Sequence, residues 1–184
     1  MKKYVVIILL FSLSVKGQNV NSQIKNLVNT KLVDFLEKIP NGQENLYGFN
    51  DRTDFLNCKA GNPIQVLSLD INNVLIKQNV WRVPVILNNE YKILFTVINK
   101  NNKLEIVDIG GVKLAKELEK HHKNKPLSLL RIYKAHIDFI SNSSGNLDNY
   151  LFKPLESSLQ FILNQSNNTQ KTYTINEVKS LINR

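Results

Sequence analysis

Three apolar-rich segments, residues 80–87, 91–98 and 103–109, follow one another so closely that only tight turns fit between them. The connections, residues 88–89 and 99–102, consist of asparagines and one lysine. Asparagine suits such turns because it tolerates positive backbone φ and hydrogen-bonds to its own backbone. A parallel pair would need a long crossover, so segments joined this tightly must be antiparallel neighbours. The sequence therefore predicts an antiparallel meander in the middle of the chain.

The first segment of the meander contains a proline, which restricts where its strand can lie. Trp81 and Val83 would face one side of the sheet, while Arg82 and Pro84 would face the other. Pro84 has no N–H to donate to a neighbouring strand. We therefore expect this strand at an edge of the sheet or over a β-bulge.

Two further runs are typical of strands, residues 64–70 and residues 127–140. The second run alternates well enough to predict one long strand. Its other side, which includes His136 and Asp138, is polar at one end, as a solvent-facing half would be. One side carries the apolar positions Leu127, Leu129, Tyr133, Ala135, Ile137 and Phe139.

Helices are predicted at both ends of this strand region. Residues 21–39 and 112–122 repeat apolar positions at three- and four-residue steps, the spacing of an amphipathic helix. Pro154 would open a third helix, and Thr174 with Glu177 forms a capping box at the start of a fourth. The sequence thus predicts an α+β fold in two layers, a mainly antiparallel sheet with an N-terminal helix and C-terminal helices packed on it.

The chain begins with the pattern of a cleavable secretory signal peptide. Lys2 and Lys3 give the segment a positively charged start, and residues 4–13 form its apolar run. Val15 and Gly17 are modest side chains at the third-last and last positions before the expected cleavage site. The apolar run is too short to span a bilayer as a helix, which needs about 20 residues. We therefore expect residues 1–17 to be removed and residues 18–184 to form one domain in the periplasm or outside the cell.

Charge and cysteine content narrow the class of protein. The chain carries a formal charge of +9, and loss of the leader leaves 21 basic against 15 acidic residues, or +6. The lysines are spread along the sequence rather than gathered on one segment with aromatic residues, so nucleic-acid binding is disfavoured. Cys58 is the sole cysteine, so an exported chain has no internal disulfide and must be held by its core.

Catalytic and metal-binding residues are few. Cys58 with His121, His122 or His136 could supply a thiolate and its base, but no local signature supports this, and an inert half-buried thiol is favoured. His136 and Asp138 share a strand face, yet two ligands do not make a metal site. The sequence therefore favours a protein that is not an enzyme and predicts no metal and no cofactor.

Candidate binding residues lie in one loop and one strand. The loop around Tyr47 and Arg52 is rich in polar and aromatic side chains, and such loops carry function more often than strands do. Trp81 and Pro84 mark the strand whose edge we expect to be open to an added strand.

Several of these segments together resemble a known group of proteins. Residues 46–49, Phe55, residues 60–63 and residues 81–85, with the strand, turn, strand and Gly-Gly continuation, are similar to small exported bacterial proteins of the Bacteroidota type whose function is unknown. The resemblance spans residues 46–116. It implies a bacterial envelope protein and brings no activity or site residues with it.

The sequence leaves three functions open. The leading hypothesis is an exported domain that is not an enzyme and binds a protein or peptide partner in the cell envelope through a sheet face or edge. The second is a hydrolase that uses Cys58 or a pair formed by His136 and Asp138. The third is a carrier of a small apolar ligand in a cavity lined by Trp81, Phe95 and Tyr133.

Overall fold

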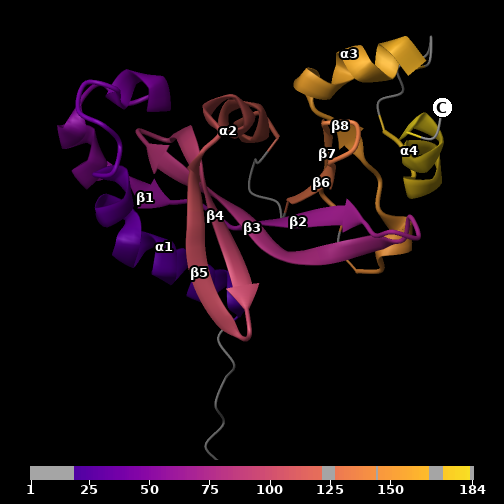
Figure 1. Ribbon diagram of the computed structural model, residues 1–184, viewed down its shortest axis with the longest axis horizontal. Coiled ribbons are helices and arrows are strands. Elements are labelled where there is room, and N and C mark those ends of the chain that lie inside the picture. Colours follow the sequence, from indigo (N-terminus) through magenta and orange to yellow (C-terminus); the bar gives the residue numbers. More distant parts are fainter. Residues whose placement is uncertain (1–18, 122–126, 144, 166–171, 183–184) are drawn as a thin grey trace, which may run out of the picture.

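A computed structural model describes four stretches of the chain, residues 19–121, 127–143, 145–165 and 172–182 (Figure 1). The predicted signal segment, residues 1–17, and His122 lie outside them. The helices and strands are α1 (Val20–Leu36), η1 (Glu44–Tyr47), η2 (Arg52–Asn57), β1 (Lys59–Ala60), β2 (Ile64–Leu69), β3 (Leu75–Leu87), β4 (Glu90–Lys100), β5 (Lys103–Gly110), α2 (Val112–Glu119), β6 (Ser128–Ile132), β7 (Ile137–Ser141), η3 (Leu147–Asn149), β8 (Lys153–Pro154), α3 (Glu156–Gln165) and α4 (Ile175–Ile182).

These elements form an α+β fold with an eight-stranded, mostly antiparallel sheet and helices at both ends, as predicted. The strand order is β5-β4-β3-β2-β6-β7-β8, and β1 pairs with β3 beside this path. Among the described residues, no helix is both long enough and apolar enough to cross a membrane.

The turns of the central hairpins have the backbone geometry that their asparagines favour. Asn88 and Asn89 have φ of 52° and 65°, and Asn101 and Asn102 have φ of 53° and 62°. β3, β4 and β5 pair as antiparallel neighbours through these turns. β3 begins at Leu75, earlier than expected, because its first part forms a hairpin with β2.

The run predicted as one long strand is a hairpin instead. β6 and β7 pair antiparallel, with Leu130 opposite Phe139, and His136 takes a left-handed φ of 53° in the turn between them. Leu129 and Leu130 are both fully buried, because this hairpin is covered on both faces. Side chains that are apolar on both sides hide the period of a strand, so the pattern did not reveal the turn.

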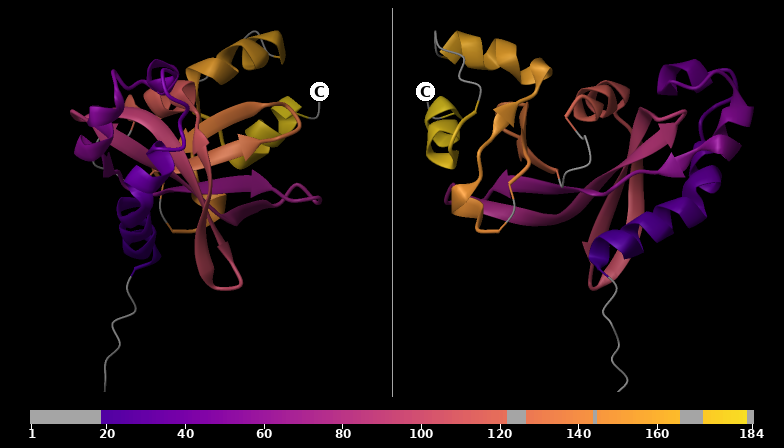
Figure 2. Two further views of the ribbon diagram at one scale, coloured as in Figure 1. Left: turned by 60° about the vertical axis from the view of Figure 1, so that its left-hand side comes forward. Right: turned by 180° about the vertical axis from the view of Figure 1, so that it is seen from behind.

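β6 also forms a parallel pair with β2, through Gln65 with Ser128 and Leu67 with Leu130. The sheet is therefore mixed rather than antiparallel throughout. This pair joins the hairpins β3-β4-β5 to the C-terminal part of the chain, and Figure 2 shows the two parts on either side of β2 and β3.

The helices cover both faces of the sheet, which corrects the expected two layers. α1 packs on the face that carries Val83, Val85 and Phe95, whereas α2 packs on the opposite face with Leu94 and Leu129. A strand that is buried on both faces carries apolar side chains on both, and β4 has this pattern. Helix periodicity shows which face of a helix is apolar, but it does not show which face of the sheet it meets.

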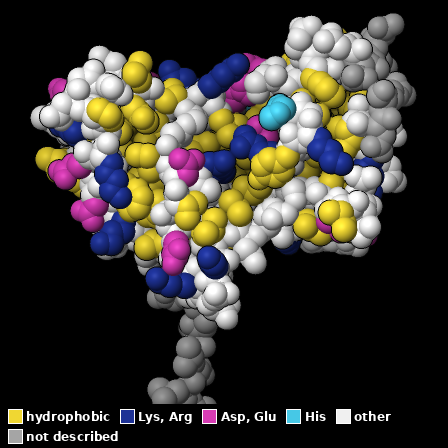
Figure 3. All heavy atoms as spheres, in the orientation of Figure 1, with side chains coloured by type: hydrophobic (Ala, Val, Ile, Leu, Met, Phe, Trp, Pro, Cys, Tyr) yellow, Lys and Arg dark blue, Asp and Glu magenta, His cyan; other side chains and the backbone are white. Residues whose placement is uncertain are grey.

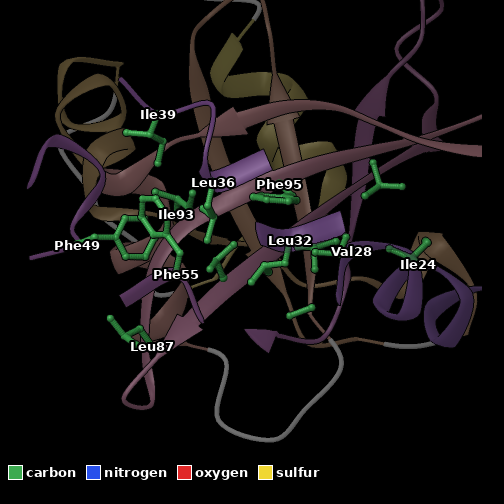
Figure 4. Packing of buried hydrophobic residues seen from close by; sticks show 14 of the residues in the cluster. Ile24, Val28, Leu32, Leu36, Ile39, Phe49, Phe55, Leu87, Ile93 and Phe95 are labelled. Carbon is green, nitrogen blue, oxygen red and sulfur yellow. The ribbon is translucent and has the colours of Figure 1, made fainter. Parts of the chain in front are cut away.

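Each of the two parts of the molecule has its own cluster of buried hydrophobic residues, which we call the first core and the second core. The first core joins α1 to β3 and β4, and in it Phe49 and Phe55 meet edge to face near Ile93, with ring centroids 5.2 Å apart (Figure 4). Its buried members are Ile24, Val28, Leu32, Leu36, Ile39, Phe49, Phe55, Ala60, Trp81, Val83, Val85, Leu87, Ile93, Phe95 and Val97. The second core joins β2, β3, β6 and β7 to the C-terminal helices, and its members are Leu67, Leu75, Leu130, Ile132, Ile137, Phe139, Tyr150, Phe152, Ile162, Tyr173, Ile175, Val178 and Leu181.

The starts of the C-terminal helices were predicted with different success. Thr174 and Glu177 form the expected capping box, because the Glu177 carboxylate accepts from Thr174 N at 2.7 Å and Thr174 Oγ1 accepts from Glu177 N at 3.3 Å. Pro154 does not open α3. It lies in β8 opposite Phe139, and the helix begins at Glu156.

Candidate functional site

A row of polar side chains crosses the sheet on the face that carries α2. Arg82 in β3, Thr96 in β4 and Asp108 in β5 lie directly opposite one another in the strand register. The Arg82 guanidinium donates from Nη1 to Thr96 Oγ1, and the same Nη1 lies 3.7 Å from Asp108 Oδ2. The Arg82 side chain is 20% exposed and the Asp108 side chain 63%, so the carboxylate stands largely in solvent.

The same row continues in the second part of the molecule. Arg131 in β6 forms a side-on, bidentate salt bridge with Asp138 in β7. Nε donates to Oδ1 at 2.8 Å and Nη2 donates to Oδ2 at 2.7 Å. Leu129 and Ile140 pack with α2, and Arg131 and Asp138 lie two residues further along the same strands, so this ion pair belongs to the same face of the sheet.

Asp138 is fixed by its backbone as well as by its side chain. Ser158, at the start of α3, accepts a hydrogen bond from Asp138 N at 2.7 Å and donates one to Asp138 O at 2.9 Å. The carboxylate is 14% exposed and both of its oxygens bind Arg131. A carboxylate held in this way orients an arginine and is not a free base for catalysis.

The two arginines of the row differ in their electrostatic surroundings. Burial lowers the pKa of the Arg82 guanidinium from its ordinary value, and the nearby positive charge of Arg131 lowers it further. The hydrogen bonds to Asp138 instead raise the pKa of Arg131. Tyr133, which is 61% exposed, follows β6 directly, and it lines the same pocket as Arg131. We refer to Arg82, Thr96, Asp108, Arg131 and Asp138 as the polar row.

Figure 3 shows the face of the molecule that is turned toward the reader in Figure 1. Lys and Arg side chains lie at the centre of this view, bordered by apolar and acidic side chains. The arrangement can bind charged groups, since guanidiniums that are partly withdrawn from water interact more strongly with an anion than fully exposed ones do.

The candidate catalytic residues do not converge. Cys58 lies between η2 and β1 and packs at the first core, whereas Asp138 lies in β7, in the other part of the molecule (Figure 1). The Cys58 thiol donates to Asp54 O at 3.3 Å, and burial raises its pKa to about 11, with a further contribution from the Asp54 charge. At neutral pH this thiol is protonated and a poor nucleophile.

The two histidines that the structure describes, His121 and His136, lie in different segments. His136 is exposed in the turn between β6 and β7, and it does not share the strand face that we expected it to share with Asp138, because it belongs to a turn. Burial lowers the pKa of His121, which follows α2, and the Lys153 charge adds to this. Among the described residues, no three His, Cys, Asp or Glu side chains are grouped to hold a metal ion.

Arg52, a candidate binding residue, supports the end of α1. Its Nη2 donates to Ile39 O at 2.7 Å and to Glu37 O at 3.3 Å; Glu37 is the C-cap of α1, and Ile39 lies in the turn that follows the helix. Its Nε donates to Asn41 Oδ1 at 2.5 Å and lies 3.4 Å from Glu44 Oε1. A cation next to the C-terminus of a helix interacts favourably with the helix dipole, and here it also pairs carbonyls of the turn that ends α1. Arg52 is therefore engaged within the fold.

The other binding candidates are in the interior. Trp81 is 5% exposed in the first core, and Tyr47 is half-buried against the same core. Pro84 is buried in β3, which has β4 on one side and β1 and β2 on the other, so the expected sheet edge at Pro84 is wrong. The proline is tolerated because β2 and β1 are interrupted beside it, and Gly61 N donates to Pro84 O at 2.7 Å in that gap. A register shift after Val85 places a bulge next to it, as expected.

The cavity proposed for an apolar ligand is not formed by the residues that we expected. Trp81 and Phe95 are packed in the first core, while Tyr133 is exposed in the turn after β6. Tyr133 instead borders a pocket of about 290 Å³ between the β2-β3 turn, the β6-β7 turn and the end of α4. Leu69, Ile71, Arg131, Ile132 and Ile182 also line it.

The sequence did not single out the polar row. Arg82 is the only charged residue in the apolar segment 80–87 and Arg131 is the only charged residue of β6, and this is the signal that could have identified them. A charged side chain in such a strand is seldom buried without a partner. The two positions are 49 residues apart, and only the parallel pairing of β2 with β6 brings them onto one face. Comparisons with protein-family models, with curated proteins and with solved structures found no match for this chain.

Proposed function

We propose that this chain is an exported domain, not an enzyme, that binds an acidic segment of a partner protein in the cell envelope. The polar row, on the sheet face that also carries α2, is the observation that supports the proposal. Its two arginines lie at the centre of the row, and the carboxylate nearest to Arg82 is mostly in solvent. An acidic segment would meet positive charge at this centre, and such complementarity favours encounter and fixes register.

The chemistry of the described residues supports binding more than catalysis. The Cys58 thiol is protonated at neutral pH, Asp138 is committed to Arg131, and His136 stands alone in a turn. A hydrolase that uses these groups would need them in one pocket. The net charge of +6 that remains after loss of residues 1–17, from 21 basic and 15 acidic residues, also favours an acidic partner.

Export rests on the sequence pattern of residues 1–17, which we propose are cleaved, leaving residues 18–184 as one domain. The test is intact-mass analysis of the protein made in a bacterial host, in both the envelope and the cytoplasmic fraction. We expect a mature form that begins at or near Gln18 in the envelope fraction. Recovery of the full chain from Met1 in the cytoplasm alone would refute export.

Binding at the polar row is tested by site-specific photo-crosslinking in intact cells. A photoreactive phenylalanine analogue replaces Tyr133, which is exposed beside the row. A matched control replaces Leu46, which is 71% exposed in η1, away from the row. We expect a discrete crosslinked product from position 133 only, which disappears in an Arg82→Gln background and at high salt because both remove the charge attraction.

Equal products from both positions, or a product that survives both changes, would refute recognition by the polar row. A different result would indicate that the partner binds at another place on the sheet, the β5 edge. β5 is the long edge strand of the sheet, and Val107 in it is 50% exposed. A product from position 107 alone would indicate that the partner adds a strand to β5.

A further inference from the structure

The two arginines of the polar row use their guanidiniums differently. Arg131 presents Nε and Nη2 to both oxygens of Asp138, the side-on geometry in which an arginine fork matches a carboxylate. Arg82 uses only Nη1, which donates to Thr96 Oγ1 and lies 3.7 Å from the Asp108 carboxylate. Among the described residues, no acceptor binds Nε or Nη2 of Arg82, although these atoms form the same edge that Arg131 uses.

That edge of Arg82 is not completely buried. No buried side-chain nitrogen or oxygen among the described residues lacks a hydrogen-bond partner, so Nε and Nη2 of Arg82 each keep some contact with solvent. The side chain as a whole is only 20% exposed. A guanidinium has five N–H donors, and one that is mostly withdrawn from water while few donors are satisfied gains more from a new acceptor than an exposed one does.

We infer that the Nε and Nη2 edge of Arg82 is a carboxylate-binding site, which takes an Asp or Glu side chain of the partner in the geometry that Arg131 and Asp138 already show. The inference rests on the proposed function for the source of the carboxylate. Asp108, 63% exposed and 3.7 Å from Nη1, competes weakly for the same cation from the other side. Arg131 lies near enough to Arg82 for its positive charge to act on the Arg82 guanidinium.

The Arg131 and Asp138 pair is a control inside the same molecule. It has the same chemistry on the same face, but its arginine edge is already filled. A free carboxylate should therefore distinguish the two arginines. General attraction to positive charge would affect both, whereas side-on binding would affect Arg82 alone.

The experiment titrates sodium acetate into the isotopically labelled protein at constant ionic strength, with sodium chloride as the reference, and follows the Nε–H signals of Arg82 and Arg131 by NMR. We expect the Arg82 signal to shift and saturate while the Arg131 signal stays in place. The same titration with N-acetyl-glutamate amide distinguishes a side-chain carboxylate in a peptide context from a small free acid. Binding of acetate alone would assign the site to a small acid rather than to the partner segment.

Two substitutions test the assignment. Asp108→Asn removes the competing carboxylate at an exposed position that the fold tolerates, and it should lower the acetate Kd by about 2- to 5-fold, the range of a surface ion pair. Arg82→Lys keeps the charge without the fork and should raise the Kd by about 10-fold. Both variants are first checked for an unchanged backbone amide spectrum.

Three results would overturn the inference: no shift of Arg82, equal shifts of both arginines, or an acetate Kd that Asp108→Asn leaves unchanged. Failure of the proposed function is distinguishable from these results. If acetate binds Arg82 but position 133 gives no crosslink, the proposed function fails and the carboxylate site stands. If position 133 gives a crosslink but acetate does not bind Arg82, the carboxylate site fails and the proposed function stands.

Discussion

The first core and the second core differ in how far apart along the chain their members lie. In the first, β3, β4 and β5 follow one another through turns of two residues, and α1 packs on the resulting surface. In the second, Leu67 and Leu75 from β2 and β3 meet Ile175 and Val178 from α4. Local turn chemistry therefore accounts for most of the first core, whereas the second depends on a parallel strand pair and on packing between distant segments.

One strand ties the two cores together. β3 supplies Leu75 to the second core and Trp81, Val83 and Val85 to the first, within a single run of 13 residues. A strand that is shared in this way transmits the loss of one core to the other. We therefore expect the cores to unfold together despite their different origins.

The largest expected effect tests this coupling. Phe95→Ala in the first core and Phe139→Ala in the second each remove a fully buried ring, so each should lower the free energy of unfolding by about 3–5 kcal/mol. The measurement is urea unfolding followed by far-UV circular dichroism and by fluorescence of Trp81, the sole tryptophan, which lies in the first core. In Phe139→Ala the two probes should still share one midpoint. A Trp81 midpoint equal to that of the wild type would show that the cores unfold separately.

The next effect compares the ion pairs of the polar row. Asp138→Asn leaves Arg131, 25% exposed, without the carboxylate that satisfies two of its donors, and should cost about 1.5–3 kcal/mol. Asp108→Asn removes a carboxylate that is 63% exposed and 3.7 Å from Arg82, and should cost at most about 1 kcal/mol. Both are measured by urea unfolding. Equal costs would contradict the difference that we draw between the two arginines.

A smaller effect compares one helix end from each part of the molecule. Arg52→Ala removes hydrogen bonds to the carbonyls of Glu37 and Ile39 at the end of α1 and should cost about 1–2 kcal/mol. Thr174→Ala breaks the capping box of α4 and should cost about 1 kcal/mol. Thermal unfolding provides the measurement. Arg52→Lys is the control, since it keeps the charge but loses the fork that reaches both carbonyls.

The smallest effect concerns Cys58, beside the first core. Its folded pKa of about 11 lies above the reference value of 9.0, so the protonated form is favoured by folding. The corresponding stability is fully present below pH 9 and is lost as the pH rises from about 9 to 11. Alkylation by iodoacetamide should follow a titration with a midpoint near 11 in the folded protein and near 9 in urea. A midpoint near 9 in the folded protein would mean that the thiol is not shielded.

The strand predictions succeeded where the chain turns back at once and failed where it does not. Asparagines at 88–89 and 101–102 marked the central turns correctly because their left-handed φ is a local property. The turn before Ile137 was missed because β6 and β7 are buried on both faces. Apolar residues therefore occupy both sides of each strand, and the sequence does not show which side chains face which side. Pro84 was assigned to an edge or a bulge, and the register shift after Val85 agrees with the bulge. The edge was wrong because the sequence shows a missing N–H but not the gap between β1 and β2 that accommodates the proline.

The candidate site was predicted less well than the fold. Residues chosen for their chemistry, Cys58 and His136, lie in different parts of the molecule, and Arg52 is used to support a helix. The polar row was missed because each of its members is unremarkable alone. Arg82 becomes part of a site only through its neighbours, because it donates to Thr96 on the adjacent strand and lies near the charge of Arg131.

The sequence by itself determined the hairpins β3-β4 and β4-β5, the apolar face of α1 and the capping box of α4. Each depends on residues a few positions apart, where backbone preference and side-chain periodicity act directly. Only the tertiary structure decided that β2 pairs with β6 in parallel, that α1 and α2 cover opposite faces, and that two distant arginines share one row. These features depend on which apolar surfaces bury each other best, a choice made by the whole chain at once.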